Sequence, residues 1–360
     1  MRRDLLLKLT FCCLIPFCLL GCGDDKSDKP SAGAGTGAAS GGAPAKSGGD
    51  DFKIVILTNG SSPFWDACDR GLKDAGQKLS VRVELVRNVD ASEGGQIRRL
   101  EQLATQNDVK GVGVSVLESE ASGVLEQMQA LRAKGVKVIT VDSDGPREGR
   151  EAFVGTNNLE AGRELGRLTS QLRPDGGKAV TFVGTLGAQN AKERIQGFKE
   201  GLNANIELVD SMEDAVDVTR AQNNVTAAIQ NHPDVNILAG IWSYNAPAIT
   251  DVITSNGRRK DFTIVAFDAE PNAIAAMDKG LIDAMVVQNP YDMGYTGATL
   301  LYRLITGDKA GVEELLKGRD VVDTGLKVVV PKQDSPVQSK SRITLEAFKG
   351  WLAEKGLEGS

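Results

Sequence analysis

The chain has 360 residues, of which 42 are Lys or Arg, 48 are Asp or Glu, five are Cys and one is His. A formal net charge of −6 offers no basic surface for nucleic acid, and the scarcity of His and Cys argues against a zinc site. We therefore predict no metal, no cofactor and no nucleic-acid partner. The length suits two domains of ordinary size.

The chain opens with a short apolar segment that ends in a cysteine. Basic residues precede an apolar run from Leu9 to Leu20, which is too short to span a bilayer and suits the apolar core of a signal peptide. A small residue, Gly21, stands before Cys22, and this ending resembles the lipobox of bacterial lipoproteins. The resemblance implies a signal peptide at 1–21, acylation of Cys22 and a lipid-anchored protein on the periplasmic or cell-surface side. An ordinary signal peptide with an incidental Cys is the alternative.

The segment after Cys22 has the composition of a linker. Residues 22–51 are rich in Gly, Ala and Ser and almost free of large apolar side chains, so they predict a flexible tether. Beyond the tether the body has one cysteine, Cys68, and therefore no disulfide framework. Its stability must come from large apolar cores, and Cys68 itself is best interpreted as a small core residue on a helix.

Strand-like and helix-like patterns then alternate along the body. The run Lys53 to Leu57 is nearly continuous in apolar residues, which is typical of a parallel strand buried on both faces. Phe64, Cys68 and Leu72 recur at helical spacing. We predict strands at 53–57, 81–85, 112–116, 136–141, 178–183, 237–241 and 263–267, and helices at 64–79, 97–104, 124–131 and 193–202.

This alternation predicts an α/β protein. Strands that alternate with helices of about ten residues form βαβ units and parallel sheets. The strands are too many for one comfortable sheet, so we expect two doubly wound lobes with parallel sheets. Residues 332–360 are interpreted as a tail that contains an amphipathic helix at 343–357.

Ligands of open α/β sheets bind beyond the carboxyl ends of the strands. The residues that follow the predicted strands are aromatic rings, carboxylates, amides, hydroxyls and one Arg. This mixture suits a sugar, whose C–H faces stack on rings and whose hydroxyls bond to planar polar groups. The candidate ligand-binding residues are Ser62, Phe64, Trp65, Asp66, Ser115, Asp142, Asn190, Arg194, Trp242, Asn245, Asp268 and Gln288.

The same residues do not suit catalysis. They contain no set of nucleophile, base and orienting group, and His232, the one His, stands in a turn-like string before Pro233. Each candidate also has a structural alternative. Phe64 and Trp65 would pack in the core at a helix start, Asp268 would cap a helix, and Arg194 would lie on a solvated helix face.

Several motifs in order resemble the ribose-binding-protein-like family of periplasmic solute-binding proteins. The likeness covers Phe52 to Lys332. Its strongest stretches are Ser62-Pro63-Phe64-Trp65, Val138-Ile139-Thr140-Val141-Asp142, Ala191-Lys192-Glu193-Arg194 with Gly197-Phe198, His232-Pro233-Asp234-Val235, and Ala266-Phe267-Asp268 followed by Gln288.

The resemblance implies a type I periplasmic-binding-protein fold and assigns roles to individual residues. It implies that rings stack on the ligand and that carboxylate, guanidinium and amide groups bind its hydroxyls; the residues are Phe64, Trp65, Asp142, Arg194, Asp268 and Gln288. Ribose binders of the family have Asn at the positions of Ser62, Ser115 and Trp242, and Arg at the position of Ser143. The resemblance therefore implies a sugar site that is rebuilt for a different ligand than ribose.

The family architecture further implies three crossings between the lobes, near Thr156-Asn157, Gln288-Asn289 and Asp323-Thr324. The N-terminal lobe then takes 52–156 plus 289–323, and the C-terminal lobe takes 157–288 plus 324–331. Ligand is expected to bind between the lobes and to favour the closed state of the hinge.

These observations predict a monomeric, non-enzymatic receptor for a neutral sugar or cyclic polyol. We expect the lipid-anchored protein to deliver its ligand to the permease of an ABC-type importer. One alternative is a sensor subunit that presents ligand to a chemoreceptor or sensor kinase. A transcriptional regulator is a further alternative, but regulators with the same two-lobed body begin with a helix-turn-helix, whereas the predicted signal peptide and tether precede the body here. A hydrolase would consume its ligand, whereas a receptor releases the ligand unchanged.

Overall fold

The computed structural model describes residues 52–360. The predicted signal peptide at 1–21, the acylated Cys22 and the tether at 22–51 lie outside the described residues. Within residues 52–360, none of the helices is both long and apolar enough to cross a membrane.

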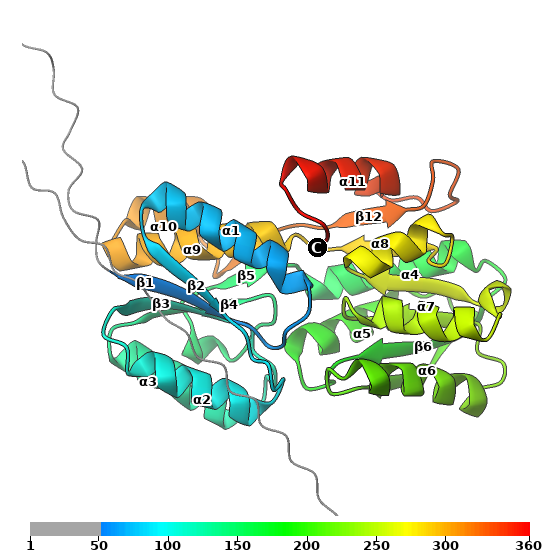
Figure 1. The fold of residues 1–360 in the computed structure, drawn as a ribbon, viewed down its shortest axis with the longest axis horizontal. Helices are drawn as coiled ribbons and strands as arrows, with labels where there is room; N and C mark the ends of the chain where they lie inside the picture. The colour runs from blue at the N-terminus through cyan, green and yellow to red at the C-terminus, as the bar shows by residue number, and fades with distance from the viewer. Residues whose placement is uncertain (1–51) are drawn as a thin grey trace, which may run out of the picture. The chain divides into compact units, whose positions relative to one another are not determined.

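The first lobe is built on a parallel sheet of six strands in the order β11-β5-β4-β3-β1-β2 (Figure 1). The central strands are buried on both faces, as the run from Ile54 to Leu57 shows. Helices α1 and α9 enclose one apolar cluster on this sheet and α2 and α3 enclose another. The strands are β1 (Lys53–Leu57), β2 (Arg82–Val86), β3 (Val109–Val114), β4 (Lys137–Val141), β5 (Phe153–Gly155) and β11 (Val321–Asp323).

The second lobe is built on a sheet of seven strands in the order β13-β12-β10-β9-β8-β6-β7. All neighbours are parallel except β10 and β12. Helices α4 and α5 cover one face and α6, α7, α8 and α11 cover the other. The strands are β6 (Gly177–Val183), β7 (Ile206–Glu213), β8 (Ile237–Gly240), β9 (Thr263–Phe267), β10 (Ala284–Val287), β12 (Lys327–Val330) and β13 (Arg342–Thr344).

Eleven α-helices lie in the described part of the chain. They are α1 (Phe64–Leu79), α2 (Glu93–Ala104), α3 (Ser122–Ala133), α4 (Asn158–Leu172), α5 (Gln189–Gly201), α6 (Val218–Asn231), α7 (Asn245–Ser255), α8 (Pro271–Asp278), α9 (Pro290–Thr306), α10 (Lys309–Leu316) and α11 (Leu345–Glu354). Two short 3₁₀ turns, Arg147–Gly149 and Arg259–Asp261, complete the elements.

The seven predicted strands and four predicted helices are present; β1, β9 and α1 have the predicted ends, and the others differ by one to four residues. Helix α5 begins at Gln189, four residues before the predicted start at Glu193. Asn190 and Arg194 therefore lie one turn apart on a single helix, and their side chains share a face.

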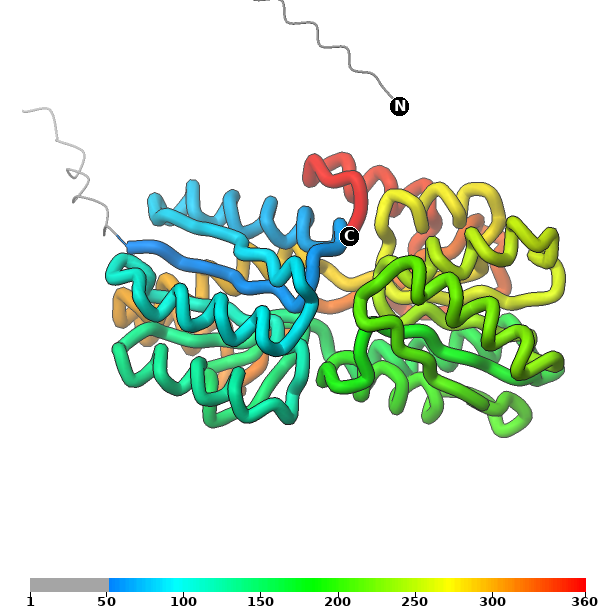
Figure 2. Tube along the Cα trace, turned by 60° about the horizontal axis from the view of Figure 1, so that its bottom comes forward, coloured from blue at the N-terminus to red at the C-terminus, as the bar shows by residue number. Residues whose placement is uncertain are grey.

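The chain passes between the two sheets three times (Figure 2). It does so between β5 and β6, between β10 and β11, and between β11 and β12. The expected crossings near Thr156, Gln288 and Asp323 fall within these connections. The residue boundaries of the lobes stay a prediction.

The C-terminal residues do not form the separate tail that the sequence suggests. Strand β13 pairs with β12 and extends the second sheet. Helix α11 buries Leu345, Phe348 and Leu352 in the core of the second lobe. The sequence predicts a helix from Ile343 onward, but residues 342–344 form a strand because β12 is their hydrogen-bonding partner.

Glycines bring helices α4 and α5 into close contact. A Cβ atom at Gly162 would lie 2.3 Å from the carbonyl oxygen of Arg194, and one at Gly197 would lie 2.1 Å from that of Leu159. In the first lobe, a Cβ at Gly294 of α9 would similarly lie 2.0 Å from the carbonyl oxygen of Cys68 in α1. Because these glycines have no Cβ, the helix backbones contact each other directly, and this contact sets the positions of α5 and α1 on their sheets. Both helices begin at the face between the lobes.

We predict that Gly162→Ala destabilises the protein by about 1–3 kcal/mol, because the added methyl group would overlap the backbone of α5. Thermal unfolding of the purified variant measures the loss. The control is Gly94→Ala on helix α2, where the new Cβ would meet only the flexible end of Arg98 at 3.4 Å. Equal stability of the two variants would contradict the close packing of α4 on α5.

Candidate functional site

The carboxyl ends of both sheets face a common cavity with about 380 Å³ of empty space, part of it open to solvent. Residues from both lobes line it, as expected for a site beyond the ends of parallel strands. The lining residues are Asn59, Gly60, Ser61, Ser62, Phe64, Trp65, Asp142, Asn190, Arg194, Val216, Trp242, Ser243, Tyr244, Asp268 and Gln288.

Nine of the twelve candidate residues from the sequence line this cavity. These nine are Ser62, Phe64, Trp65, Asp142, Asn190, Arg194, Trp242, Asp268 and Gln288. The other three, Asp66, Ser115 and Asn245, do not line it. That the nine contact a ligand remains a prediction.

Asp66 points away from the cavity. Its side chain is 73% exposed, and its Oδ1 accepts a hydrogen bond from Arg87 at 2.6 Å. Trp65, its neighbour on helix α1, is buried against Phe64 with the two rings edge to face. One residue along a helix turns the side chain by about 100°, so Trp65 and Asp66 cannot both face the ligand.

Ser115 and Asn245 lie behind the lining residues and hold them. The Ser115 hydroxyl donates to Oδ2 of Asp142 at 3.0 Å. The Asn245 side chain accepts from the backbone N–H of Trp242 at 2.9 Å and donates to Asp214 at 2.9 Å. Both were predicted as ligand contacts because they follow strand ends, but a strand end also supplies the groups that orient the lining residues.

Arg194 is the central charge of the site and is 1% exposed. Its Nε donates to Asn158 at 2.8 Å, and its Nη1 donates to the carbonyl oxygen of Ile241 at 3.0 Å. Its guanidinium lies over the ring of Phe267, 4.5 Å from the centroid. Nη2 has no hydrogen-bond partner among the described residues. A buried cation held this rigidly offers one open donor to a ligand.

Two aspartates flank this guanidinium, one from each lobe. Asp142 follows β4 and lies 3.7 Å from Arg194, and Asp268 follows β9 and lies 3.9 Å away. Both have positive φ, 65° and 63°, which is strained for a residue with a side chain. This backbone turn directs each carboxylate from its strand end toward Arg194.

Burial opposes ionisation of these carboxylates. It raises the pKa of Asp142 above its ordinary value and raises the pKa of Asp268 to about 6, while the nearby Arg194 lowers both. Gln288 donates from Nε2 to both oxygens of Asp268 at 3.1 Å. Its own Oε1 has no partner among the described residues. Arg194 and Gln288 therefore bring one open donor and one open acceptor to the site, which suits a hydroxyl group.

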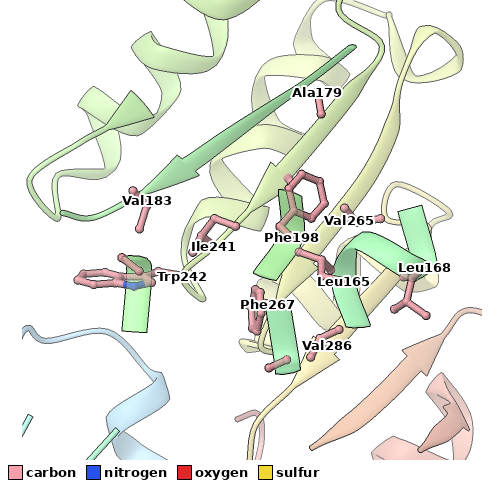
Figure 3. Packing of buried hydrophobic residues seen from close by; sticks show 14 of the residues in the cluster. Leu165, Leu168, Ala179, Val183, Phe198, Ile241, Trp242, Val265, Phe267 and Val286 are labelled. Atoms are coloured by element: carbon pink, nitrogen blue, oxygen red, sulfur yellow. The ribbon is translucent and has the colours of Figure 1, made fainter. Parts of the chain in front are cut away.

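Trp242 forms an apolar wall on the second lobe. Its indole N–H donates to Oδ1 of Asn190 at 3.2 Å, and Asn190 in turn donates to Asp142 at 3.3 Å. Figure 3 shows Trp242 at one edge of the apolar cluster, beside Val183 and away from Leu168. A Cβ atom at Gly184 would lie 2.2 Å from the indole, so this glycine makes room for the ring.

Two buried carboxylates near the cavity were missed from the sequence. Asp214 accepts hydrogen bonds from Tyr244 at 2.5 Å and from the backbone N–H of Val216 at 2.9 Å. Glu270 accepts one from Ser243 at 2.5 Å. Burial raises the pKa of Asp214 to about 6 and that of Glu270 to about 7. Asp214 directly follows β7, a strand that the sequence patterns did not predict, and Glu270 stands three residues beyond β9, a position that surface loops share.

Polar contacts connect the lobes around the cavity. The Ser62 and Ser243 hydroxyls lie 3.4 Å apart. On the rim, the backbone N–H of Ser119 donates to Gly187 at 3.0 Å, and Lys192 pairs with Glu120 at 2.6 Å. The lobes thus touch directly on two sides of the cavity, which describes a closed cleft.

The described residues contain no cluster of three His, Cys, Asp or Glu side chains placed to hold a metal ion. Cys68 is fully buried, and burial raises the pKa of its thiol, as a core residue requires. His232 ends helix α6 and contacts Asp210 at 3.4 Å, away from the cavity. The arrangement can bind and enclose a small polar molecule.

Comparison with known proteins gives a consistent result. A family model described as a periplasmic binding protein domain matches residues 53–309. The chain is 26% identical over 270 residues to the D-allose-binding periplasmic protein of Escherichia coli K12, which covers 71% of this chain and 84% of that protein.

Solved structures confirm the predicted type I fold. A solute-binding protein of an ABC transporter from Burkholderia graminis, in complex with D-arabinose, is 28% identical with a TM-score of 0.72 and covers 79% of this chain and 96% of that one. A glucose-galactose binding protein from Geobacillus stearothermophilus is 26% identical with a TM-score of 0.71 and covers 79% of this chain and 99% of that one.

We predict that the stability of the ligand-free protein depends on pH through Glu270. Its folded pKa, about 7, lies above its ordinary value of 4.5, so protonation favours the folded state. The free energy of unfolding should therefore fall as the pH rises from about 4.5 to 7 and level off above that. Glu270→Gln should flatten this part of the profile and stabilise the protein at pH 8 by up to about 3 kcal/mol.

Thermal unfolding between pH 4.5 and 8 measures the effect. The control is Glu126→Gln on helix α3, which removes the same charge from an exposed position. Asp214 and Asp268 keep part of the slope in both variants because burial raises their pKa values as well. A Glu270→Gln profile parallel to that of the wild type would contradict the assignment.

Proposed function

This chain belongs to the periplasmic binding protein domain family, and we propose that it captures a neutral sugar or cyclic polyol in the cleft between its lobes. The family binds solutes without transforming them, and this chain is not an enzyme. The proposal is supported above all by two open groups of the cavity, Nη2 of Arg194 and Oε1 of Gln288. A hydroxyl both donates and accepts, so the hydroxyls of a sugar suit both atoms.

The aromatic residues support the same ligand class. Phe64 and Trp65 of the first lobe and Trp242 of the second line the cavity. We infer that these rings contact the C–H faces of a sugar ring, while its hydroxyls bond to the planar polar groups between them.

The charges of the cavity favour a neutral ligand. Asp142 and Asp268 against Arg194 sum to one negative charge when both carboxylates are ionised. An anionic ligand would then meet repulsion that is poorly screened in an enclosed site. Two of these proteins are named for D-allose and for glucose and galactose, and the third was solved in complex with D-arabinose; all four sugars are neutral aldoses. We therefore propose an aldose as the first ligand class to test.

We further propose how the protein is used in the cell. Cys22 is acylated after removal of residues 1–21, and residues 22–51 tether the body to the membrane on the extracytoplasmic side. The protein then acts as a monomer that delivers its ligand to the permease of an ABC-type importer. The lobes take 52–156 plus 289–323 and 157–288 plus 324–331, and they separate to release the ligand.

The binding proposal predicts a large loss of affinity on removal of Arg194. Arg194→Ala should weaken sugar binding by about 10- to 150-fold, because a hydrogen bond from a charged group to the ligand is lost. Gln288→Ala should weaken it by about 3- to 10-fold, because the lost hydrogen bond joins neutral groups. Titration calorimetry with D-allose, D-arabinose, D-glucose and D-galactose measures the affinity.

The control is Arg98→Ala, which removes an exposed cation paired with Asp90 on the surface of the first lobe. Circular dichroism checks the fold of each variant, and Gln288→Ala provides a neutral change if Arg194→Ala fails to fold. The proposed site is wrong if both folded variants keep the wild-type affinity. The proposed ligand class is wrong if the wild-type protein binds a phosphate or carboxylate compound in preference to every neutral sugar.

The anchor is tested separately in cells. Cys22→Ser should move the protein from the membrane fraction to the soluble fraction, because thioether and amide acylation of this cysteine supply the lipid chains. Fractionation followed by immunoblotting gives the distribution. Cys68→Ser is the control, since Cys68 is buried in the body and cannot carry a lipid. A Cys22→Ser protein that stays in the membrane fraction would exclude the lipid anchor.

A further inference from the structure

The last six residues, 355–360, leave helix α11 and run between the two lobes; we call this segment the C-terminal strap. Figures 1 and 2 both show the end of the chain between the lobes. Helix α11 ends in a Schellman turn, in which Gly356 has a φ of 65° and the N–H of Leu357 donates to Leu352 at 2.9 Å. The turn redirects the chain from the second lobe toward the first. The strap lies beyond residues 53–309, which match the family model.

The start of the strap contacts the first lobe. The Lys355 ammonium lies over the ring of Tyr291 in helix α9, 4.3 Å from its centroid. Tyr291 donates to Asp74 at 3.0 Å, and Asp74 pairs with Arg70 on helix α1 at 3.1 Å. A Cβ atom at Gly356 would lie 3.5 Å from the Arg70 guanidinium. These contacts join the end of α11 in the second lobe to α1 and α9, which cover one face of the first sheet.

The end of the strap pairs with the backbone beside the cavity. Ser360 and Ala269 exchange two backbone hydrogen bonds, of 2.7 Å from the Ala269 N–H and 3.0 Å from the Ser360 N–H. Ser360 is 1% exposed, and a Cβ atom at Gly359 would lie 2.7 Å from the carbonyl oxygen of Ala269. The end of the strap is therefore both hydrogen-bonded to Ala269 and closely packed against it.

Ala269 stands between two residues of the site. Asp268 precedes it in a strained conformation with a φ of 63° and lines the cavity, and Glu270 follows it and accepts from Ser243. Such a turn keeps its shape only if the surrounding structure holds it. The two hydrogen bonds between Ser360 and Ala269 therefore fix the backbone between Asp268 and Glu270.

We propose that the C-terminal strap is a positioning element of the binding site, which fixes the Asp268 turn and links it to the first lobe. This rests on the proposed function, because the ligand that Asp268 meets is the sugar in the cleft. The strap tightens binding by preorganising the Asp268 carboxylate. Its loss lets the turn relax and speeds ligand release.

The test removes Glu358–Ser360 and keeps Leu357, whose side chain packs in the second lobe and completes the Schellman turn. Hydrogen exchange of the ligand-free protein should show faster exchange of the Ala269 amide. Calorimetry and stopped-flow fluorescence with D-allose, D-arabinose, D-glucose and D-galactose should show a dissociation constant raised about 3- to 10-fold, the effect of one ordinary hydrogen bond, and carried mainly by the dissociation rate.

Three point variants distinguish displacement of the strap from other effects of the deletion. Gly359→Ala should act like the deletion, because its methyl group would overlap Ala269 and displace the strap. Ser360→Ala should behave like the wild type, because both bonds to Ala269 come from the backbone and the Ser360 hydroxyl has no partner among the described residues. Gly350→Ala on α11 meets nothing within 4 Å and should also leave affinity unchanged.

Unchanged affinity in the deletion variant would overturn the proposal even if its melting temperature fell, since the strap would then be only structural. Unchanged exchange at Ala269 would overturn it as well, since the strap would not hold the turn. If the wild type bound none of these sugars, the proposed function would fail separately, and the exchange measurement would still decide whether the strap fixes the Asp268 turn.

Discussion

The structure depends on one buried cation. Arg194 is enclosed by both lobes, stacked on Phe267 and flanked by Asp142 and Asp268 at 3.7 and 3.9 Å. A guanidinium is strongly destabilised in a dry interior unless opposite charges and hydrogen bonds surround it. These ion pairs are too long to be hydrogen bonds, so the ligand-free site is only partly satisfied. A polar ligand that accepts a hydrogen bond from the open Nη2 of Arg194 completes the site. Ligand binding then offsets part of the free energy that burial of the guanidinium costs.

The position of this cation is set by helix packing outside the cavity lining. Arg194 lies on α5, and its own carbonyl oxygen contacts the surface that Gly162 leaves open on α4. In the first lobe Gly294 does the same for α1, the helix that begins with Phe64 and Trp65. In each lobe, a glycine on a neighbouring helix thus sets the position of a helix that carries side chains lining the cavity. Arg194 on α5 and the rings of Phe64 and Trp65 on α1 are therefore positioned in the same way.

The fold and most of the site could be predicted from the sequence because both follow local patterns. Buried strands read as apolar runs, and the residue after each strand, such as Asp142 or Asp268, falls at the cleft by topology. The predictions were wrong where a residue distant in the sequence determines the side-chain direction or the secondary structure. Arg87 draws Asp66 outward, and β12 turns residues 342–344 into a strand. Asp214 was missed because strand β7, which it follows, was not predicted, and only burial distinguishes Glu270 from a loop carboxylate.

Closure of the cleft is a balance of small contacts. The lobes meet through the hydroxyls of Ser62 and Ser243, through Ser119 and Gly187, and through further polar pairs such as Lys192 and Glu120. Each such contact contributes about 1 kcal/mol net or less. A ligand that bonds to residues of both lobes adds contacts that exist only in the closed state. A ligand shifts a conformational equilibrium only by the difference between its affinities for the two states. Contacts to both lobes exist only in the closed state, so ligand binding favours closure. Asp142 from one lobe and Asp268 from the other, directed at the same guanidinium, are placed to supply that difference.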